Sequence, residues 1–336
     1  MALPPALQIP LSLPVAAAPL FIASGPELVI AQCTSGVIGS FPALNARPER
    51  ALDDWLHQIK SEIEKYAATH PKAPIAPFAV NQIVHRPNDR LERDMETILT
   101  HKVPLVITSL GARSDINDAV HSYGGIVLHD VISNEHAHKA IEKGADGIIA
   151  VAAGAGGHAG TQSPFALLRE IRRWFDGPLL LSGAITHGNS VLAALAAGAD
   201  LAYIGTAFLS TREANTTEAY KQMIVDSTAR DIVYSNLFTG VHGNYLRSSI
   251  IGAGLDPDNL PHSDPTAMSF GSVGGSKVKA WRDIWGAGQG VGTLTASVTV
   301  HQLITRLKDE FERAARELIR SSAIRAIDTK TVNNLS

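Results

Sequence analysis

Short apolar runs alternate with helix-like stretches through the middle of the chain, from about residue 103 to residue 204. Each run is about five residues long and almost continuously apolar, which is typical of strands buried on both faces of a parallel sheet. Two helix-like stretches, 133–143 and 187–197, are followed by a glycine, which favours the left-handed turn that ends a helix. The predicted strands are 104–108, 125–129, 146–151, 178–182 and 200–204.

The spacing of these strands indicates where the active site lies. Their starts are separated by 21, 21, 32 and 22 residues, so one step is about ten residues longer than the others. The surplus is the loop 152–163, directly after the strand that ends near Val151. Because the loops after strand C-termini build the active site of parallel α/β folds, we expect this loop to be functional.

Three further strands are predicted before residue 103, at 15–18, 36–40 and 75–81, with a helix from Pro48 to about Thr69. Eight strands with intervening helices favour a (β/α)8 TIM barrel over the alternative, an open doubly wound sheet. The barrel is therefore the predicted fold class.

The alternation stops after the eighth strand, and this predicts the domain organisation. The barrel is expected over residues 1–230, followed by an irregular, lid-like segment at 231–295 that is rich in Gly, Ser, Asn and Pro. A C-terminal helix, roughly 297–321 within the segment 296–322, is expected to pack back on the barrel, and 323–336 to form a flexible tail.

Composition narrows the class of protein. The 336 residues carry 29 Lys and Arg against 32 Asp and Glu, a formal charge of −3, so nothing predicts a nucleic-acid partner. The single cysteine, Cys33, excludes an internal disulfide and a thiolate metal site. The first 46 residues lack Lys and Arg and are interrupted by prolines, unlike a secretory signal. We expect a soluble, cytoplasmic protein with no membrane association.

The surplus loop contains the strongest chemical signal, the run from Gly154 to Gly160 with His158 inside it. Glycines allow a flat or anionic ligand to approach the backbone closely. Histidine titrates near neutrality, which suits it to proton transfer. We interpret His158 as the catalytic candidate; a flexible surface loop is the alternative.

A second signal follows the seventh and eighth strands. TIM barrels often bind phosphate at the loops after these strands, through backbone N–H groups. The residues at these strand ends are Ser182, Gly183, Gly205 and Thr206, so we predict that they hold the phosphate of a cofactor or substrate.

Other polar residues at strand ends are less specific. Asn81 ends the third strand and is equally consistent with a turn or a hydrogen-bonding role. His129 and Asp130 follow the fifth strand, but no third ligand accompanies them at a recognisable spacing, so no metal site is predicted. The runs 239–246 and 281–290 mix aromatic residues with glycine and are interpreted as parts of a lid that closes over a ligand; a loop packed under the last helix is the alternative.

An ordered set of these runs resembles the nitronate monooxygenases, formerly called 2-nitropropane dioxygenases. The similarity extends from about residue 10 to residue 320. It comprises Ala18–Leu20, Asn81, Ala153–Gly160, Leu181–Ile185, Tyr203–Leu209, Thr211–Glu213 and Trp285–Gln289. The set as a whole is specific, although no single run is.

The resemblance implies an FMN-dependent (β/α)8 barrel with an added segment near its C-terminus. His158 matches the histidine beside the flavin that acts as catalytic base or orients the nitronate. The positions that match flavin contacts are Ala18, Leu20, Asn81, Gly156, Gly157, Gly183, Gly205 and Thr206, and we count Ser182 and Gln289 with them.

Two positions depart from the family pattern. Several relatives have Met where this chain has Leu20, and some have Lys where it has Asp130. A cation at the second position would favour negative charge on the flavin ring, so Asp130 leaves that role open.

The implied reaction is the oxidation of alkyl nitronates by O2 to a carbonyl compound and nitrite. A nitronate is a stabilised carbanion that can pass an electron to oxidised FMN directly, whereas a neutral nitroalkane first needs a base, for which His158 is the titratable side chain in its loop. The partners expected are therefore a small nitronate or nitroalkane and O2. The sequence does not decide the oligomeric state, with a homodimer among the options.

Two alternatives stay open. An FMN-dependent NAD(P)H reductase of the same group, acting on enoyl-acyl-carrier protein or on quinones, would use a similar flavin site; the chain shows no Gly-x-Gly-x-x-Gly fingerprint after a strand, but barrels bind nicotinamide without one. A non-catalytic barrel that binds a flavin or a phosphosugar is the alternative from another class.

Overall fold

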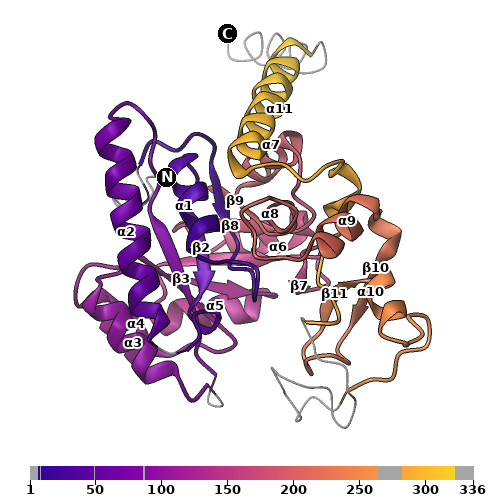
Figure 1. Ribbon diagram of the computed structural model, residues 1–336, viewed down its shortest axis with the longest axis horizontal. Coiled ribbons are helices and arrows are strands. Elements are labelled where there is room, and N and C mark those ends of the chain that lie inside the picture. The colour runs from indigo at the N-terminus through magenta and orange to yellow at the C-terminus, as the bar shows by residue number, and fades with distance from the viewer. Residues whose placement is uncertain (1–6, 8, 49, 86–87, 264–281, 322–336) are drawn as a thin grey trace, which may run out of the picture.

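Eight parallel strands alternate with helices and close into a barrel in the computed structural model of the protein (Figure 1). The structure describes residues 7, 9–48, 50–85, 88–263 and 282–321. Hydrogen-bonded neighbours follow the order β1-β9-β8-β6-β5-β4-β3-β2, and a bridge between Ala16 and Ile38 joins the first strand to the last. The barrel strands are β1 Val15–Ala17, β2 Gly39–Pro42, β3 Phe78–Ile83, β4 Leu105–Ser109, β5 Ile126–Val131, β6 Gly147–Val151, β8 Leu179–Ser182 and β9 Leu201–Ile204. The predicted TIM barrel is therefore confirmed.

Helices surround the barrel and follow its strands. The helices are α1 Pro26–Thr34, α2 Ala51–Thr69, α3 Leu91–Thr100, α4 Ser114–His121, α5 Asn134–Glu142, α6 Pro164–Arg172, α7 Gly188–Ala197, α8 Thr206–Leu209, α9 Glu218–Asp226, α10 Arg247–Gly252 and α11 Val300–Arg320. The 3-10 helices that lie wholly within the described residues are η2 Ala43–Asn45, η3 Ala229–Asp231 and η4 Gln289–Thr293. Gly144 and Gly198, after α5 and α7, have φ of +91° and +111°, as the sequence predicts. None of the described helices combines the length and apolar character needed to cross a bilayer.

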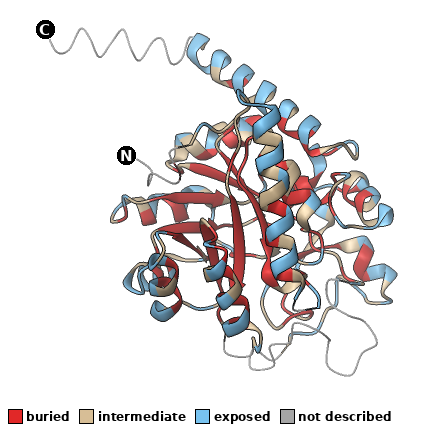
Figure 2. Ribbon diagram, turned by 60° about the vertical axis from the view of Figure 1, so that its left-hand side comes forward, coloured by how far each residue is buried: buried red, intermediate tan, exposed pale blue. Residues whose placement is uncertain are grey.

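The sequences of the strands are almost continuously apolar because both faces of each strand are buried (Figure 2). Along β5, Ile126 and Leu128 pack inside the barrel, whereas Val127 and Val131 pack against the surrounding helices. The same alternation holds in β4, with Leu105 and Ile107 on the inside. In β3, β4 and β5 the next inward position toward the C-terminal end is polar and is occupied by Asn81, Ser109 and Asp130.

Two predicted strands begin later than expected. The second is Gly39–Pro42 instead of 36–40, because residues 35–37 form the turn out of α1 and Gly36 has φ of +81°. The third is Phe78–Ile83 instead of 75–81, since Pro74 and Pro77 have no N–H to give to a strand ladder. Both strands therefore end two residues later than predicted, at Pro42 and Ile83, on the side of the barrel where the strand C-termini lie.

The segment after α9 is more regular than the sequence predicts. Within its described part, which we call the excursion (residues 232–263 and 282–294), β10 Ile232–Ser235 and β11 Gly243–Leu246 form an antiparallel pair. A third strand, β7 Gly157–His158, comes from the surplus loop and pairs with β11 (Figure 1). No local pattern reveals this pairing, because the partners lie more than eighty residues apart. Residues 264–281, with Trp281, and the predicted tail lie outside the described residues.

The C-terminal helix α11 packs on α7, where the sequence expects a helix that returns to the barrel (Figure 1). Its first turn has a capping box, in which the Thr299 side chain accepts from Gln302 N and the Gln302 side chain accepts from Thr299 N. Glu213 also accepts a hydrogen bond from Val300 N, at 3.0 Å. These contacts tie the start of α11 to the barrel.

Candidate active site

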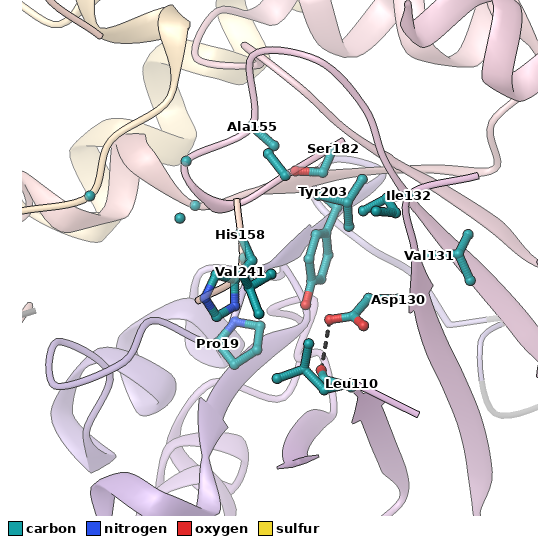
Figure 3. A pocket seen from close by; sticks show the side chains of 18 of the residues that line it. Pro19, Leu110, Asp130, Val131, Ile132, Ala155, His158, Ser182, Tyr203 and Val241 are labelled. Carbon is teal, nitrogen blue, oxygen red and sulfur yellow. Dashed lines mark hydrogen bonds between the residues drawn. The ribbon is translucent and has the colours of Figure 1, made fainter. Parts of the chain in front are cut away.

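A cavity of about 850 Å³ opens at the C-terminal end of the barrel strands (Figure 3). Its wall is mostly apolar and is built from strand ends, from the loops that follow them and from the excursion. All of the predicted site residues except Gln289 line it: Ala18, Leu20, Asn81, Gly156, Gly157, His158, Ser182, Gly183, Gly205 and Thr206. Gln289 is exposed, and its backbone N–H donates to Gly154 O at 2.9 Å, which places it behind the loop wall.

The excursion holds the surplus loop in place. Asn244 Nδ2 donates to Ala155 O at 2.6 Å, and the Tyr234 hydroxyl donates to Ala159 O at 2.9 Å. A Cβ on Gly156 would lie only 2.7 Å from Gly288 N, so the two segments meet at a point where glycine leaves just enough room. The predicted functional loop is therefore a packed wall of the cavity.

His158 lies on β7, directly opposite Gly243 of β11, and its ring reaches the cavity. Its Nε2 lies 3.0 Å from Thr239 Oγ1, a residue of the excursion. Burial lowers the pKa of His158 to about 4, so the imidazole is neutral at physiological pH. A neutral imidazole can accept a proton from a ligand, which is the chemistry expected of this residue.

The predicted phosphate residues meet on one side of the cavity, because β8 and β9 are neighbours in the barrel. Gly183 has φ of +147°, and a Cβ there would lie 2.8 Å from Ala153 O, so this turn requires glycine. Thr206 Oγ1 accepts a hydrogen bond from Gly288 N at 2.9 Å. The hydroxyl keeps its own proton for another acceptor, so it can bind a ligand oxygen while it holds the excursion.

A hydrogen-bonded chain of polar side chains crosses three adjacent strands at the opposite side. Asn81 Nδ2 of β3 donates to Ser109 Oγ of β4 at 2.7 Å, and Ser109 Oγ donates to Asp130 Oδ2 of β5 at 2.7 Å. All three residues occupy inward positions and line the cavity. Burial raises the pKa of Asp130 to about 6. In Figure 3 the Tyr203 side chain reaches from β9 toward the same region. Burial and, to a smaller extent, the proximity of Asp130 raise the pKa of its phenol.

The sequence did not single out Ser109 or Tyr203. The signal that would have found them is the alternation of the strands, since both stand one inward step beyond a buried apolar residue. The same alternation separates His129 from Asp130. His129 points to the outer face, where its Nδ1 lies 2.6 Å from Thr108 Oγ1, and burial lowers its pKa to about 4. The two side chains therefore leave opposite faces of β5.

The sequence model of the nitronate monooxygenase family matches residues 9–310 of the chain. A nitronate monooxygenase of Paraburkholderia phytofirmans is 27% identical over an alignment that covers 91% of this chain and 94% of the relative. A probable nitronate monooxygenase of Bacillus subtilis is 25% identical, with 75% of this chain and 76% of the relative covered.

Solved structures share the fold. A nitroalkane oxidase from Streptomyces ansochromogenes superposes with a TM-score of 0.76 at 24% identity, covering 92% of this chain and 98% of the other. FabK from Thermotoga maritima gives a TM-score of 0.71 at 23% identity, covering 93% and 96%. At these identities the likeness concerns the fold.

Proposed function

The chain belongs to the nitronate monooxygenase family, and from this premise we propose that it uses FMN to oxidise alkyl nitronates with O2 to a carbonyl compound and nitrite. Membership makes the protein an oxidoreductase that acts on nitro compounds. The observation that supports the finer proposal is the composition of a single cavity, whose mostly apolar wall includes His158 and the glycine-rich ends of β8 and β9.

The residues of the cavity fit FMN in size and chemistry. Its volume of about 850 Å³ lies within the range of roughly 300–1,000 Å³ that cofactor and ligand sites occupy. We assign the phosphate to Ser182, Gly183, Gly205 and Thr206, because two of these positions have no side chain and leave the backbone N–H groups accessible. We assign contacts with the rest of the flavin to Ala18, Leu20, Asn81, Gly156 and Gly157.

The side chains of the cavity have separate tasks in this proposal. Bound FMN would supply the acceptor for an electron from the nitronate. The apolar wall excludes water and suits O2 and the alkyl group of a small nitronate. Neutral nitroalkanes must first lose a proton, and His158 is the base that accepts it. The His158 imidazole can do so because it is itself unprotonated. Nitronates do not need this step.

The visible spectrum of the purified protein, followed by anaerobic titration, tests the proposal. We expect a flavin spectrum that ethyl nitronate bleaches without O2, with nitrite released when O2 is admitted. His158→Asn is expected to keep the flavin and to lose activity on neutral nitroethane at least ~10-fold more than on ethyl nitronate. Equal losses on both substrates would show that His158 positions the nitronate and is not the base.

The same preparation separates the alternatives. Rapid bleaching by NADH or NADPH, with no response to nitronate, would contradict the proposal and indicate a reductase. A protein that stays colourless and does not bind added FMN would also contradict it, and would favour the phosphosugar-binding barrel.

A further inference from the structure

Two histidines and one aspartate meet on the outside of the barrel, where α2 contacts α3. Asp53 and His57 belong to α2 and are four residues apart, so the helix presents both side chains on one face. His101 directly follows the last residue of α3. Each of the three side chains offers a ligand atom for a metal ion, and these atoms lie within 4.8 Å of one another.

The Asp53 carboxylate lies between the two imidazoles. One of its oxygens is 2.7 Å from His101 Nε2, and the other is 3.6 Å from His57 Nδ1. The two rings approach edge to face, with 4.6 Å between their centroids. Ligands that bind one zinc ion at about 2.0–2.2 Å stand about 3–4 Å from one another, so these separations have to change by about 1 Å or less.

One of the three side chains is fixed by packing, and the other two can adjust to an ion. The His101 side chain is only 6% exposed, whereas those of Asp53 and His57 are 54% and 71% exposed. Rotation of the two exposed side chains therefore requires no repacking of the core. Their exposure also leaves room for water, which completes the coordination of a zinc ion that has three protein ligands.

The donor atoms indicate which kind of ion fits the group. Imidazole nitrogens combined with one carboxylate oxygen suit Zn2+, whereas Mg2+ and Ca2+ prefer oxygen ligands throughout. The Lys60 ammonium is also close, since it donates to the backbone carbonyl of His101 at 2.5 Å. The negative charge of the Asp53 carboxylate offsets this positive charge when a cation binds.

We propose that Asp53, His57 and His101 bind a Zn2+ ion on the outside of the barrel and so link α2 to α3. The contact between Asp53 and His101 already joins the two helices, and the ion replaces it with two metal–ligand bonds while His57 supplies a third. Because the ligands come from two helices, the site exists only in the folded chain, and binding stabilises the fold. None of the three residues lines the cavity, so the site is independent of the proposed reaction.

Isothermal titration calorimetry with ZnCl2 tests the site on full-length protein that has first been dialysed against a chelator. We expect one ion per chain in the tightest class of sites, and much weaker binding of MgCl2. The Zn2+ affinity should fall at least ~10-fold in His57→Ala, in His101→Ala and in Asp53→Asn, because loss of an outer-shell partner alone typically costs about 10–100-fold. His301→Ala, which removes an exposed histidine of α11, is the matched control and should bind Zn2+ as the wild type does.

Thermal unfolding gives a second readout that does not depend on catalysis. Zn2+ should raise the Tm of the wild type and of His301→Ala, and should raise it less in the three ligand variants. His57→Ala keeps the test valid if the loss of the buried His101 ring disturbs packing, since the His57 side chain is mostly exposed. Absence of saturable Zn2+ binding by the wild type, or unchanged affinity in His57→Ala, would overturn the proposal. An equal loss in His301→Ala would also overturn it, because the ion would then bind surface histidines without selectivity.

Discussion

Asp130 carries a carboxyl group into a cavity whose wall is mostly apolar. The carboxyl accepts a hydrogen bond from Ser109 Oγ, which in turn accepts one from Asn81 Nδ2, so the chain of donors ends on the carboxyl. Among the residues that the structure describes, the cations that line the cavity are Lys139 and Lys143 of the α5 region, and Asp130 has no ion pair with either of them. At the residue scale, Asp130 is therefore hydrogen-bonded by a neutral donor, and its burial makes the ionised carboxylate unfavourable in free energy.

This cost predicts a pH-dependent effect of Asp130→Asn on stability. The pKa of Asp130 is raised from 3.8 to about 6, so its contribution to stability is present at low pH and is lost as the pH rises through 6. The variant should therefore gain about 1–3 kcal/mol of unfolding free energy relative to wild type between pH 5 and pH 8. Urea unfolding of the flavin-free protein at pH 5 and at pH 8 measures the difference in unfolding free energy between the variant and the wild type.

Asp54→Asn, on the exposed face of α2, is the control for this measurement. It should leave the difference from wild type the same at both pH values. If the advantage of Asp130→Asn does not grow between pH 5 and pH 8, the carboxyl is not destabilised by burial.

At the scale of the elements, α7 and α11 cross in very close contact. A Cβ on Gly188, the first residue of α7, would overlap Leu307 O and Phe311 N of α11. Glu310 of α11 accepts a hydrogen bond from Gly188 N at 2.8 Å, and its other oxygen lies 3.3 Å from His187 Nε2. The absence of a side chain at one position therefore sets the distance between the two helices.

Gly188→Ala should destabilise the protein, because the added methyl group has no space and the helices must move apart. Overpacking typically costs about 1–3 kcal/mol, more than the gain of up to ~1 kcal/mol from replacing a helical glycine. Chemical denaturation gives the change in unfolding free energy. Gly252→Ala, in α10, is the matched control because a Cβ there has nothing within 4 Å. A Gly188→Ala variant as stable as that control would contradict the close crossing.

At the scale of the whole molecule, the active-site wall is shared between two parts of the chain. The barrel supplies the strand ends, and the excursion holds the loop that carries His158 through β11, Asn244 and Tyr234. The excursion also has a small apolar cluster of its own: Phe238, Tyr245, Ile250 and Ile284. Loosening this contact should therefore affect the loop without unfolding the barrel.

Asn244→Ala tests this division. The change leaves the buried Ala155 O without its donor, which costs about 1–3 kcal/mol. We expect faster amide hydrogen exchange in residues 153–160 and in β11, with unchanged protection in β3, β4 and β5. Arg247→Ala, which breaks an exposed ion pair with Asp258, should change neither. Faster exchange throughout the barrel strands would mean that excursion and barrel unfold as one unit.

The sequence alone determined the features that short segments encode. Apolar runs of strand length, glycines after helices and a step of unusual length were sufficient to predict the barrel and the position of the loop with His158. They were sufficient because burial on both faces and left-handed turns depend on residues within one element. Strand starts at 36 and 75 were placed too early, because apolar composition continues through a turn and past prolines that cannot join the ladder.

Only the tertiary structure decided which of these residues act together. The separation of His129 from Asp130 depends on the strand register, and the Asn81–Ser109–Asp130 chain depends on the order of three neighbouring strands. Thr239 reaches His158 because β11 pairs with β7, a contact between segments with no common pattern. Hydrogen bonds of this kind arise when folding brings segments that are distant in sequence within about 3 Å of one another, and the linear order of residues does not contain that distance.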